Sequence, residues 1–281
     1  MLSYRHAFHA GNFADVFKHV LLVQLLHALR RKEKPFCVLD THAGAGRYDL
    51  RSAPARKNRE FEEGIGRLWR QSGLSAELAA YLERVRALNP DGQLREYPGS
   101  PRIAHALLRP GDRLILTERN PAEFAQLNAE FAGERQVAIH PGDGYAALKA
   151  FLPPLERRGL VLIDPAYELK DEFDRLIAAV QFIHRRWAGG IVAIWYPILD
   201  RAPSLRFQRT LQGLGIPAIL CAELGLYPYD VPLGLHGCGL IIINPPWQLD
   251  ETLKRLLPDL LQRLQAGEHG QTRLEWLVPA P

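Results

Sequence analysis

Short apolar runs recur along the chain and predict the strands of a buried sheet. Most of them are apolar almost throughout, which is typical of strands that are covered on both faces. Six or seven such runs are present, at residues 36–40, 113–118, 136–140, 159–164, 190–196, 217–222 and 237–243. Helical patterns separate several of them, at 121–132, 144–151, 171–187 and 204–213. Strands that alternate with helices predict an α/β fold with a parallel, doubly wound sheet.

A helix is predicted ahead of the first strand, over residues 12–31. Its apolar residues are spaced mostly three and four positions apart, as on one face of a helix. They are Phe13, Val16, Phe17, Val20, Leu21 and Leu25. Asn12 and Asp15 have the spacing of a capping pair at the N-terminus of this helix.

The interval between the first two strands is too long for one crossover helix. Apolar residues with helical spacing lie within it: Leu78, Leu82, Val85 and Leu88. We therefore predict a helical insertion subdomain at 50–100, carried by one domain that consists of 1–49 and 101–281. A basic run at 51–59 begins the insertion. Such a run is usually a solvated face, so a role in binding nucleic acid is the less favoured interpretation.

The composition is that of a globular protein, because 47% of the 281 residues are hydrophobic and 23% are charged. The formal charge of +4 permits a polyanionic partner without establishing one. No apolar run approaches the ~20 residues of a membrane span. Three cysteines without a C-x-x-C pair fit neither a disulfide framework nor a cysteine zinc site. His6, His9 and His19 lack metal-ligand spacing. We expect a cytoplasmic protein without a membrane segment or a metal.

Polar residues follow three of the predicted strands at the sheet edge where ligands bind in open α/β folds. Gly44 and Gly46 follow the first strand and would let the backbone approach a ligand closely, although tight turns also use glycine. Glu118 ends the second strand, where a carboxylate can accept both hydroxyl protons of a ribose. Asp143 and Gly144 follow the third strand. Asp143 can accept a hydrogen bond from an adenine amino group, and the next backbone N–H can donate to the ring. Together these residues predict a cofactor that contains adenosine.

The fourth strand ends at Asp164-Pro165-Ala166-Tyr167, which is close to the D-P-P-Y signature of enzymes that methylate exocyclic amino groups. An adenine N6 is a poor nucleophile, because its lone pair is delocalised into the ring. The Asp164 carboxylate and the Pro165 carbonyl can each accept one N6–H and draw that lone pair toward a methyl donor. Tyr167 can stack on a base that has left its helix or loop. Positioning supplies most of the gain in this arrangement.

A second motif, Asn244-Pro245-Pro246-Trp247, satisfies the same loose pattern. It follows the last predicted strand and should lie farther along the sheet than the cofactor crevice. We therefore predict that Asp164 is catalytic and that the two prolines end a strand.

A nicotinamide dehydrogenase is a competing enzyme class, since glycine-rich turns and Glu118 also suit a dinucleotide. The sequence disfavours it, because Gly44-x-Gly46 has no third glycine and Glu118 lies far beyond the ~20 residues at which the ribose-binding acid normally follows.

The whole chain resembles the bacterial 23S ribosomal RNA adenine-N6 methyltransferase J family. The shared segments are 4–12 with Asp15, Lys18 and His19, then 40–48, 97–101, 143–144 and 244–247. The resemblance implies S-adenosyl-L-methionine as the methyl donor and 23S ribosomal RNA as the substrate. It also implies a class I methyltransferase fold, Rossmann-like, with an antiparallel last strand and a helical insertion.

The resemblance also implies site residues. Those expected at the cofactor are Lys18, His19, His42, Gly44, Ser100, Glu118, Asp143, Gly144 and Asp164. Those expected to be catalytic are Asp164, Pro165 and Tyr167, and those expected at the substrate are Tyr4, His6 and Tyr167. We expect a monomer.

Ala166 departs from the family, which has a second proline there. We expect activity to be retained with a looser site, because the predicted N6 acceptors remain. Two rival functions stay open: the same chemistry on DNA, and a non-catalytic RNA-binding module with a relict methyltransferase fold.

Overall fold

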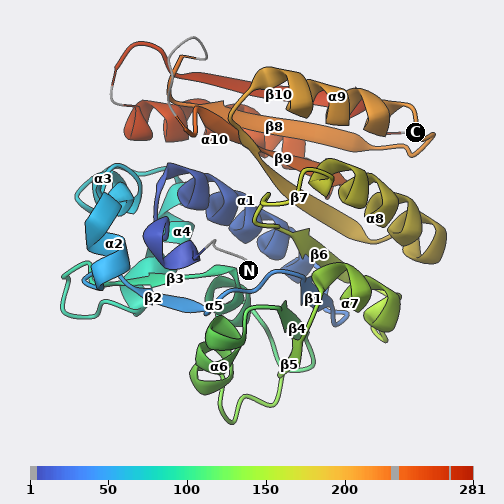
Figure 1. Ribbon diagram of the computed structural model, residues 1–281, viewed down its shortest axis with the longest axis horizontal. Coiled ribbons are helices and arrows are strands. Elements are labelled where there is room, and N and C mark those ends of the chain that lie inside the picture. The colour runs from blue at the N-terminus through green and yellow to red at the C-terminus, as the bar shows by residue number, and fades with distance from the viewer. Residues whose placement is uncertain (1–4, 229–233, 266, 281) are drawn as a thin grey trace.

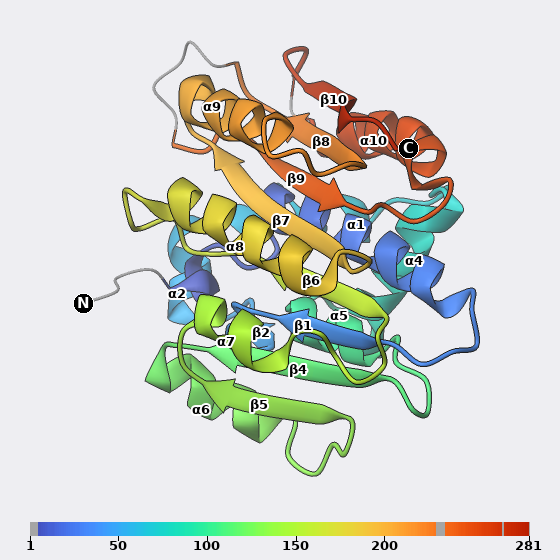
Figure 2. The ribbon, with the colours of Figure 1, turned by 90° about the vertical axis from the view of Figure 1, so that its right-hand side faces the viewer.

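One eight-stranded sheet runs through the computed structural model of the protein, which describes residues 5–228, 234–265 and 267–280 (Figure 1). Its strand order is β10-β8-β9-β7-β6-β1-β4-β5, and Figure 2 shows this succession from one edge of the sheet to the other. The strands are β1 (Cys37–Asp40), β4 (Arg113–Glu118), β5 (Val137–Pro141), β6 (Gly159–Ile163), β7 (Ile191–Ile198), β8 (Ile219–Gly225), β9 (Gly237–Ile243) and β10 (Gln271–Val278).

The middle of the sheet is parallel and confirms the predicted doubly wound topology. Strands β5, β4, β1, β6 and β7 are parallel neighbours. Asp40 at the end of β1 is level with Leu162 of β6 and Leu116 of β4, so these strands end together. Strand β9 runs antiparallel to both β7 and β8. This confirms the antiparallel orientation expected for the last predicted strand and the class I methyltransferase fold.

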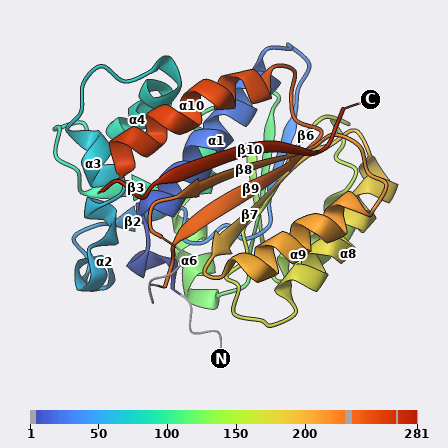
Figure 3. The ribbon, with the colours of Figure 1, turned by 90° about the horizontal axis from the view of Figure 1, so that it is seen from above.

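Helices cover both faces of the sheet, as the near-continuous apolar strands require (Figure 3). One face carries α1 (Phe13–Arg30), α5 (Ser100–His105), α6 (Pro121–Glu130) and α10 (Leu249–Leu264). The other face carries α7 (Gly144–Phe151), α8 (Glu172–Trp187) and α9 (Arg201–Gln212).

Strand residues alternate between the two apolar cores. Val38 of β1 lies in the core beneath α1, whereas its neighbours Cys37 and Leu39 lie in the core beneath α8. Leu160 and Val161 of β6 divide in the same way. Successive side chains of a strand point to opposite faces, so one short apolar run supplies both cores.

The segment expected to form the insertion, 50–100, contains four short helices and one strand, and the partner strand β2 (Arg47–Asp49) lies just before it. The helices are α2 (Ala53–Asn58), the 3-10 helix η2 (Glu60–Glu62), α3 (Ile65–Trp69) and α4 (Ala76–Ala87), and the strand is β3 (Glu96–Pro98). Strand β2 pairs with β3, and α4 packs against α1 in the core of the sheet. The boundaries at 50 and 100 stay a prediction.

Several elements were not predicted, and the predicted start of β8 was inaccurate. The sequence pattern did not reveal the 3-10 helix η1 (His6–Phe8), β2, β3, α5, α10 or β10. Strand β10 is half-exposed at the sheet edge and lacks a continuous apolar run, and α10 contains Pro258. Strand β8 begins at Ile219 rather than 217 because Pro217 cannot donate to a ladder and Ala218 has a positive φ of 55°. In the described part of the chain, no helix is long and apolar enough to span a membrane.

Leu25→Ala should lower the free energy of unfolding by about 2–5 kcal/mol, because Leu25 is fully buried in α1 and its loss leaves a cavity. Denaturation by urea, followed by circular dichroism, measures the change. Leu155→Ala is the matched control, since that leucine is 85% exposed. Equal effects of the two substitutions would contradict the assigned core.

Candidate active site

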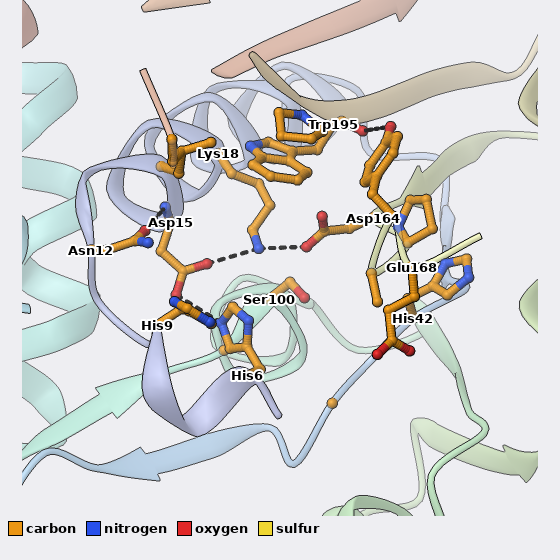
Figure 4. A pocket seen from close by; sticks show the side chains of 18 of the residues that line it. His6, His9, Asn12, Asp15, Lys18, His42, Ser100, Asp164, Glu168 and Trp195 are labelled. Carbon is orange, nitrogen blue, oxygen red and sulfur yellow. Dashed lines mark hydrogen bonds and ion pairs between the residues drawn. The ribbon is translucent and has the colours of Figure 1, made fainter. Parts of the chain in front are cut away.

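A cavity of about 680 Å³ lies where the carboxyl ends of β1, β4, β5 and β6 meet α1. The loops that follow these strands form one wall and the first turns of α1 form another (Figure 4). Parallel strands end at the same edge, so polar residues far apart in the sequence converge there.

A buried lysine connects α1 to the end of β6. Lys18 Nζ donates to Asp164 Oδ2 at 2.5 Å and lies 2.8 Å from Asp15 Oδ1. Asp15 Oδ2 is in turn 2.8 Å from His6 Nε2. The side chains of Lys18 and Asp15 are 5% and 2% exposed, and Asp164 is 15% exposed. A charged chain therefore runs from η1 through α1 to the predicted catalytic carboxylate (Figure 4).

The charges in this chain stabilise one another against burial. Burial alone would raise the pKa of Asp15, but the His6 and Lys18 charges hold it well below the usual range. Burial would lower the pKa of Lys18, yet Asp15 and Asp164 raise it above its ordinary value. The pKa of His6 is raised because the Asp15 carboxylate outweighs burial. Lys18 is therefore a permanent cation and Asp15 a permanent anion.

The Asp164 motif forms a tight turn at the edge of this cavity. Tyr167 has a positive φ of 53°, and its hydroxyl donates to the main-chain carbonyl of Trp195 at 2.6 Å. Pro165 is buried, whereas Ala166 is exposed on the cavity lining. Asp164 Oδ2 is used by Lys18, and no residue of the described chain bonds Asp164 Oδ1. One carboxylate oxygen thus stays available as an acceptor.

Glu118 and the glycine turn are joined by a hydrogen bond. Gly44, at φ +61°, donates its N–H to Glu118 Oε2 at 2.7 Å, and Asn120 N–H donates to Oε1 at 2.6 Å. A Cβ on Gly44 would lie 2.2 Å from the Tyr48 hydroxyl, so the turn requires glycine. The two backbone donors orient the carboxylate and leave a lone pair on each oxygen for further donors.

Asp143 is the N-cap of α7 and is held by a cation. Its Oδ1 accepts from Tyr145 N–H at 2.8 Å, and its Oδ2 accepts from Arg175 at 2.8 Å. Although burial raises the pKa of Asp143, these donors lower it below the usual range. A Cβ on Gly144 would lie 2.1 Å from the Thr41 carbonyl oxygen. Glycine is therefore needed where β5 meets the β1 loop.

Two neutral polar side chains, those of Ser100 and His42, line the cavity near the end of β1. Ser100 Oγ donates to Asp40 Oδ2 at 2.6 Å, and burial raises the pKa of Asp40 to about 6. Burial lowers the pKa of His42 to about 4, so its ring is neutral near pH 7.

The cavity collects every predicted site residue that the structure describes. They are His6, Lys18, His19, His42, Gly44, Ser100, Glu118, Asp143, Gly144, Asp164, Pro165 and Tyr167. Tyr4 lies outside the described residues. Within the described ranges, no group of three or more His, Cys, Asp and Glu could hold a metal ion.

Asn244 lies away from this cavity, as predicted, but for a different reason. Its side-chain amide donates to the carbonyls of Ala188 and Gly190, which precede β7. Strand β9 is antiparallel, so its carboxyl end reaches the opposite edge of the sheet rather than a farther point of the same edge.

Three further residues of the site were not predicted as site residues. Asp15, predicted only as a capping residue, joins His6 to Lys18. Arg175 holds Asp143, and the half-buried Trp195 lines the cavity near Lys18 and Asp164 (Figure 4). An acidic residue three positions before a lysine on a buried helix face was the available signal for Asp15, whereas nothing local indicated Arg175 or Trp195.

Known proteins resemble this chain over nearly its whole length. The family model described as ribosomal RNA large subunit methyltransferase D, RlmJ, matches residues 33–278. Two relatives, each named ribosomal RNA large subunit methyltransferase J, come from Escherichia coli (strain K12) and Haemophilus influenzae. They are 45% identical over 279 and 280 residues, covering 99% of this chain and 100% of each relative. A crystal structure of a Legionella pneumophila protein has a TM-score of 0.89 and 36% identity, covering 95% of this chain and 98% of that one.

Lys18→Met should lower the free energy of unfolding by about 3–5 kcal/mol, because it leaves Asp15 and Asp164 as buried carboxylates without their cation. Urea denaturation at about pH 7 measures this. Lys254→Met is the control: Lys254 pairs with Glu251 on the surface and should have little effect. A loss no larger than that of the control would contradict the assigned role of Lys18.

His42 should make the folded protein less stable in acid. The pKa of His42 is about 4 in the folded protein and 6.5 ordinarily. Between these pH values His42 is protonated in the unfolded chain and neutral in the folded protein. Stability attributable to His42 is complete above about pH 6.5 and is lost as the pH falls toward 4. His42→Gln cannot titrate and should lose less stability across this window. The test is to measure the unfolding free energies of the wild type and of His42→Gln at several pH values. Parallel pH dependences of the two proteins would refute the low pKa assigned to His42.

Proposed function

Since the chain belongs to the ribosomal RNA large subunit methyltransferase J family, we propose that it transfers a methyl group from S-adenosyl-L-methionine to N6 of an adenine in 23S ribosomal RNA. The observation that carries this proposal is the position of Asp164. Its carboxylate ends β6 inside the cavity, with Oδ2 on Lys18 and Oδ1 available. The same cavity is lined by Gly44, Glu118 and Gly144.

The cavity residues fit S-adenosyl-L-methionine, which supplies an electrophilic methyl group when bound. Glu118 has lone pairs to spare for two ribose hydroxyls, and Asp143 lies at the predicted adenine position. Gly44 and Gly144 keep the backbone free of side chains at two points of close approach. His19 Nε2 is buried without a protein partner and needs a ligand atom. We assign these residues, with His42, Ser100 and Lys18, to the cofactor side.

Asp164 and Pro165 would act on the amino group of the target adenine. Asp164 Oδ1 and the Pro165 carbonyl each accept one N6–H, which turns the nitrogen lone pair toward the methyl group. As the methyl–sulfur bond of the donor breaks and the N–C bond forms, N6 would become cationic and would then release one proton, for which Asp164 Oδ1 is the acceptor we propose. Lys18 holds the Asp164 carboxylate in place through Oδ2, so Oδ1 is oriented before the substrate binds.

The substrate side of the cavity would bind a base that has left its helix or loop. Tyr167 and Trp195 form an aromatic wall beside Asp164, held by the hydrogen bond between the Tyr167 hydroxyl and Trp195. His6 lies at the other end of the charged chain, and Tyr4 is its predicted neighbour on the RNA. Stacking and splayed-out bases are the usual means by which proteins recognise single-stranded RNA.

The cytoplasmic location and the monomeric state are further proposals. Cys37, Cys221 and Cys238 are buried free thiols, which supports a reducing compartment.

The wild-type protein should form N6-methyladenosine in unmodified 23S ribosomal RNA, and Asp164→Asn should reduce the rate by at least about 100-fold, since it replaces an acceptor that the transition state requires. Mass spectrometry of the nucleosides measures both. Unmodified DNA is the parallel substrate, and product in DNA alone would refute the RNA proposal. RNA binding without product from the wild type would instead favour the relict module.

A further inference from the structure

A buried chain of three polar side chains leads from the helical insertion to the cavity wall. Tyr81 of α4 contacts Tyr97 of β3 with a hydroxyl-to-hydroxyl distance of 3.0 Å. The Tyr97 hydroxyl lies 2.8 Å from His19 Nδ1 on α1. Both tyrosines are fully buried and His19 is 1% exposed. His19 lines the cavity, and its other ring nitrogen, Nε2, has no partner in the described protein.

The number of protons decides which way these hydrogen bonds run. Burial keeps the pKa of His19 well below its usual range and raises that of Tyr97, so the ring is neutral and the hydroxyl is protonated. Two contacts need two protons, and the two hydroxyls supply them. A proton on His19 Nδ1 would be a third, and it would leave a hydroxyl proton without an acceptor at tyrosines that do not line the cavity, where no ligand can reach it, at a cost of about 1–3 kcal/mol.

Tyr81 provides no further donor or acceptor that could change this number of protons. Its hydroxyl has no partner in the described chain besides Tyr97. The arrangement that pairs both hydroxyl protons has Tyr81 donating to Tyr97 and Tyr97 donating to His19 Nδ1. The proton that then has no protein acceptor is the one on the ring, which a ligand in the cavity can bind. The single proton of the neutral ring then lies on Nε2, at the cavity wall.

We propose that Tyr97, oriented by Tyr81 of the insertion, is a positioning residue that fixes His19 in the tautomer with Nε2–H, so that His19 donates to the bound cofactor. The inference rests on the proposed function for the identity of that cofactor. The carboxylate of S-adenosyl-L-methionine is its one anionic acceptor, and an N–H donor in a buried site is best matched by an anion.

The same reasoning gives His42 the opposite tautomer. The Thr41 hydroxyl donates its only proton to the Leu162 carbonyl at 2.9 Å, so it must accept from His42 Nδ1 at 2.8 Å. His42 Nε2 is then an acceptor. His19 and His42 therefore offer a ligand one donor and one acceptor. Because their tautomers are opposite, each serves as a reference for the other when the tautomers are measured.

The insertion gains a role in the site from this chain. Helix α4 packs against α1 through apolar side chains, and Tyr81 adds one polar contact that reaches the cavity through Tyr97. The insertion is thereby linked to cofactor affinity, although the only cofactor contact predicted within 50–100 is its last residue, Ser100.

The test compares two substitutions that each remove one fully buried hydroxyl. Tyr97→Phe deprives His19 of its proton donor, whereas Tyr81→Phe removes the same tyrosine–tyrosine bond and leaves that donor in place. Isothermal titration calorimetry with S-adenosyl-L-methionine should give about tenfold or greater loss of affinity for Tyr97→Phe. Tyr81→Phe should give a clearly smaller loss, because Tyr97 can still donate to His19 Nδ1 although Tyr81 no longer orients it. Equal losses would assign both effects to packing and overturn the proposal, as would wild-type affinity in Tyr97→Phe.

Nuclear magnetic resonance of the protein without cofactor provides a readout independent of turnover. Long-range proton–nitrogen correlation spectra of the imidazole rings, assigned with His19→Gln and His42→Gln, should show Nε2 protonated in His19 and Nδ1 protonated in His42. Tyr97→Phe should convert the His19 signals to a mixture of tautomers. A wild-type His19 protonated on Nδ1 would overturn the inference even if the variants do not fold. A wild-type protein that binds no cofactor while showing the expected tautomers would refute the proposed function instead.

Discussion

The ion pair between Lys18 and Asp164 is the contact on which the site depends. Isolated charges are costly to bury, and here one ammonium neutralises two carboxylates that would otherwise repel each other. The pair joins the first long helix to the end of a central strand, 146 positions away in the sequence. Because it occupies one oxygen of Asp164 and leaves the other available, the contact that holds α1 in place also aims the carboxylate.

The remaining polar groups are organised by the same need to satisfy buried charges and donors. Glu118 is held by two backbone N–H groups, Asp143 by a helix N-terminus and Arg175. In each case the structural partners use part of the carboxylate and leave acceptor capacity for a ligand. A cavity assembled in this way is preorganised, since little must move when a cofactor that contains adenosine binds.

The two buried histidines extend this principle to neutral groups. A neutral imidazole can be a donor or an acceptor at either nitrogen, and the choice is made by its second partner. Tyr97 makes it for His19 and Thr41 for His42. The helical insertion thus reaches the site through Tyr81 and Tyr97. Its longest helix, α4, packs on α1 through apolar side chains.

Features that depend on local pattern could be predicted from the order of residues alone. Short, near-continuous apolar runs predicted seven strands of the main sheet, and polar residues at the strand ends predicted Glu118, Asp143 and Asp164 as site residues. A whole-chain resemblance added His19, His42 and Ser100, which share no local signal with the others. The edge strand β10 was not predicted, because a half-exposed strand has weak periodicity. Helix α10 was not predicted although its leucines recur at helical spacing, since its interior Pro258 is atypical of a helix.

Contacts between residues that are far apart along the chain could be seen only in the folded structure. The antiparallel direction of β9 placed Asn244 at the opposite edge of the sheet from Asp164, although the two motifs look alike. The partners of Lys18, Asp143 and Tyr97 come from other elements, and no spacing along the chain encodes them. Hydrophobic periodicity is set by neighbours in the sequence, whereas charge pairing and proton direction are set by neighbours in space.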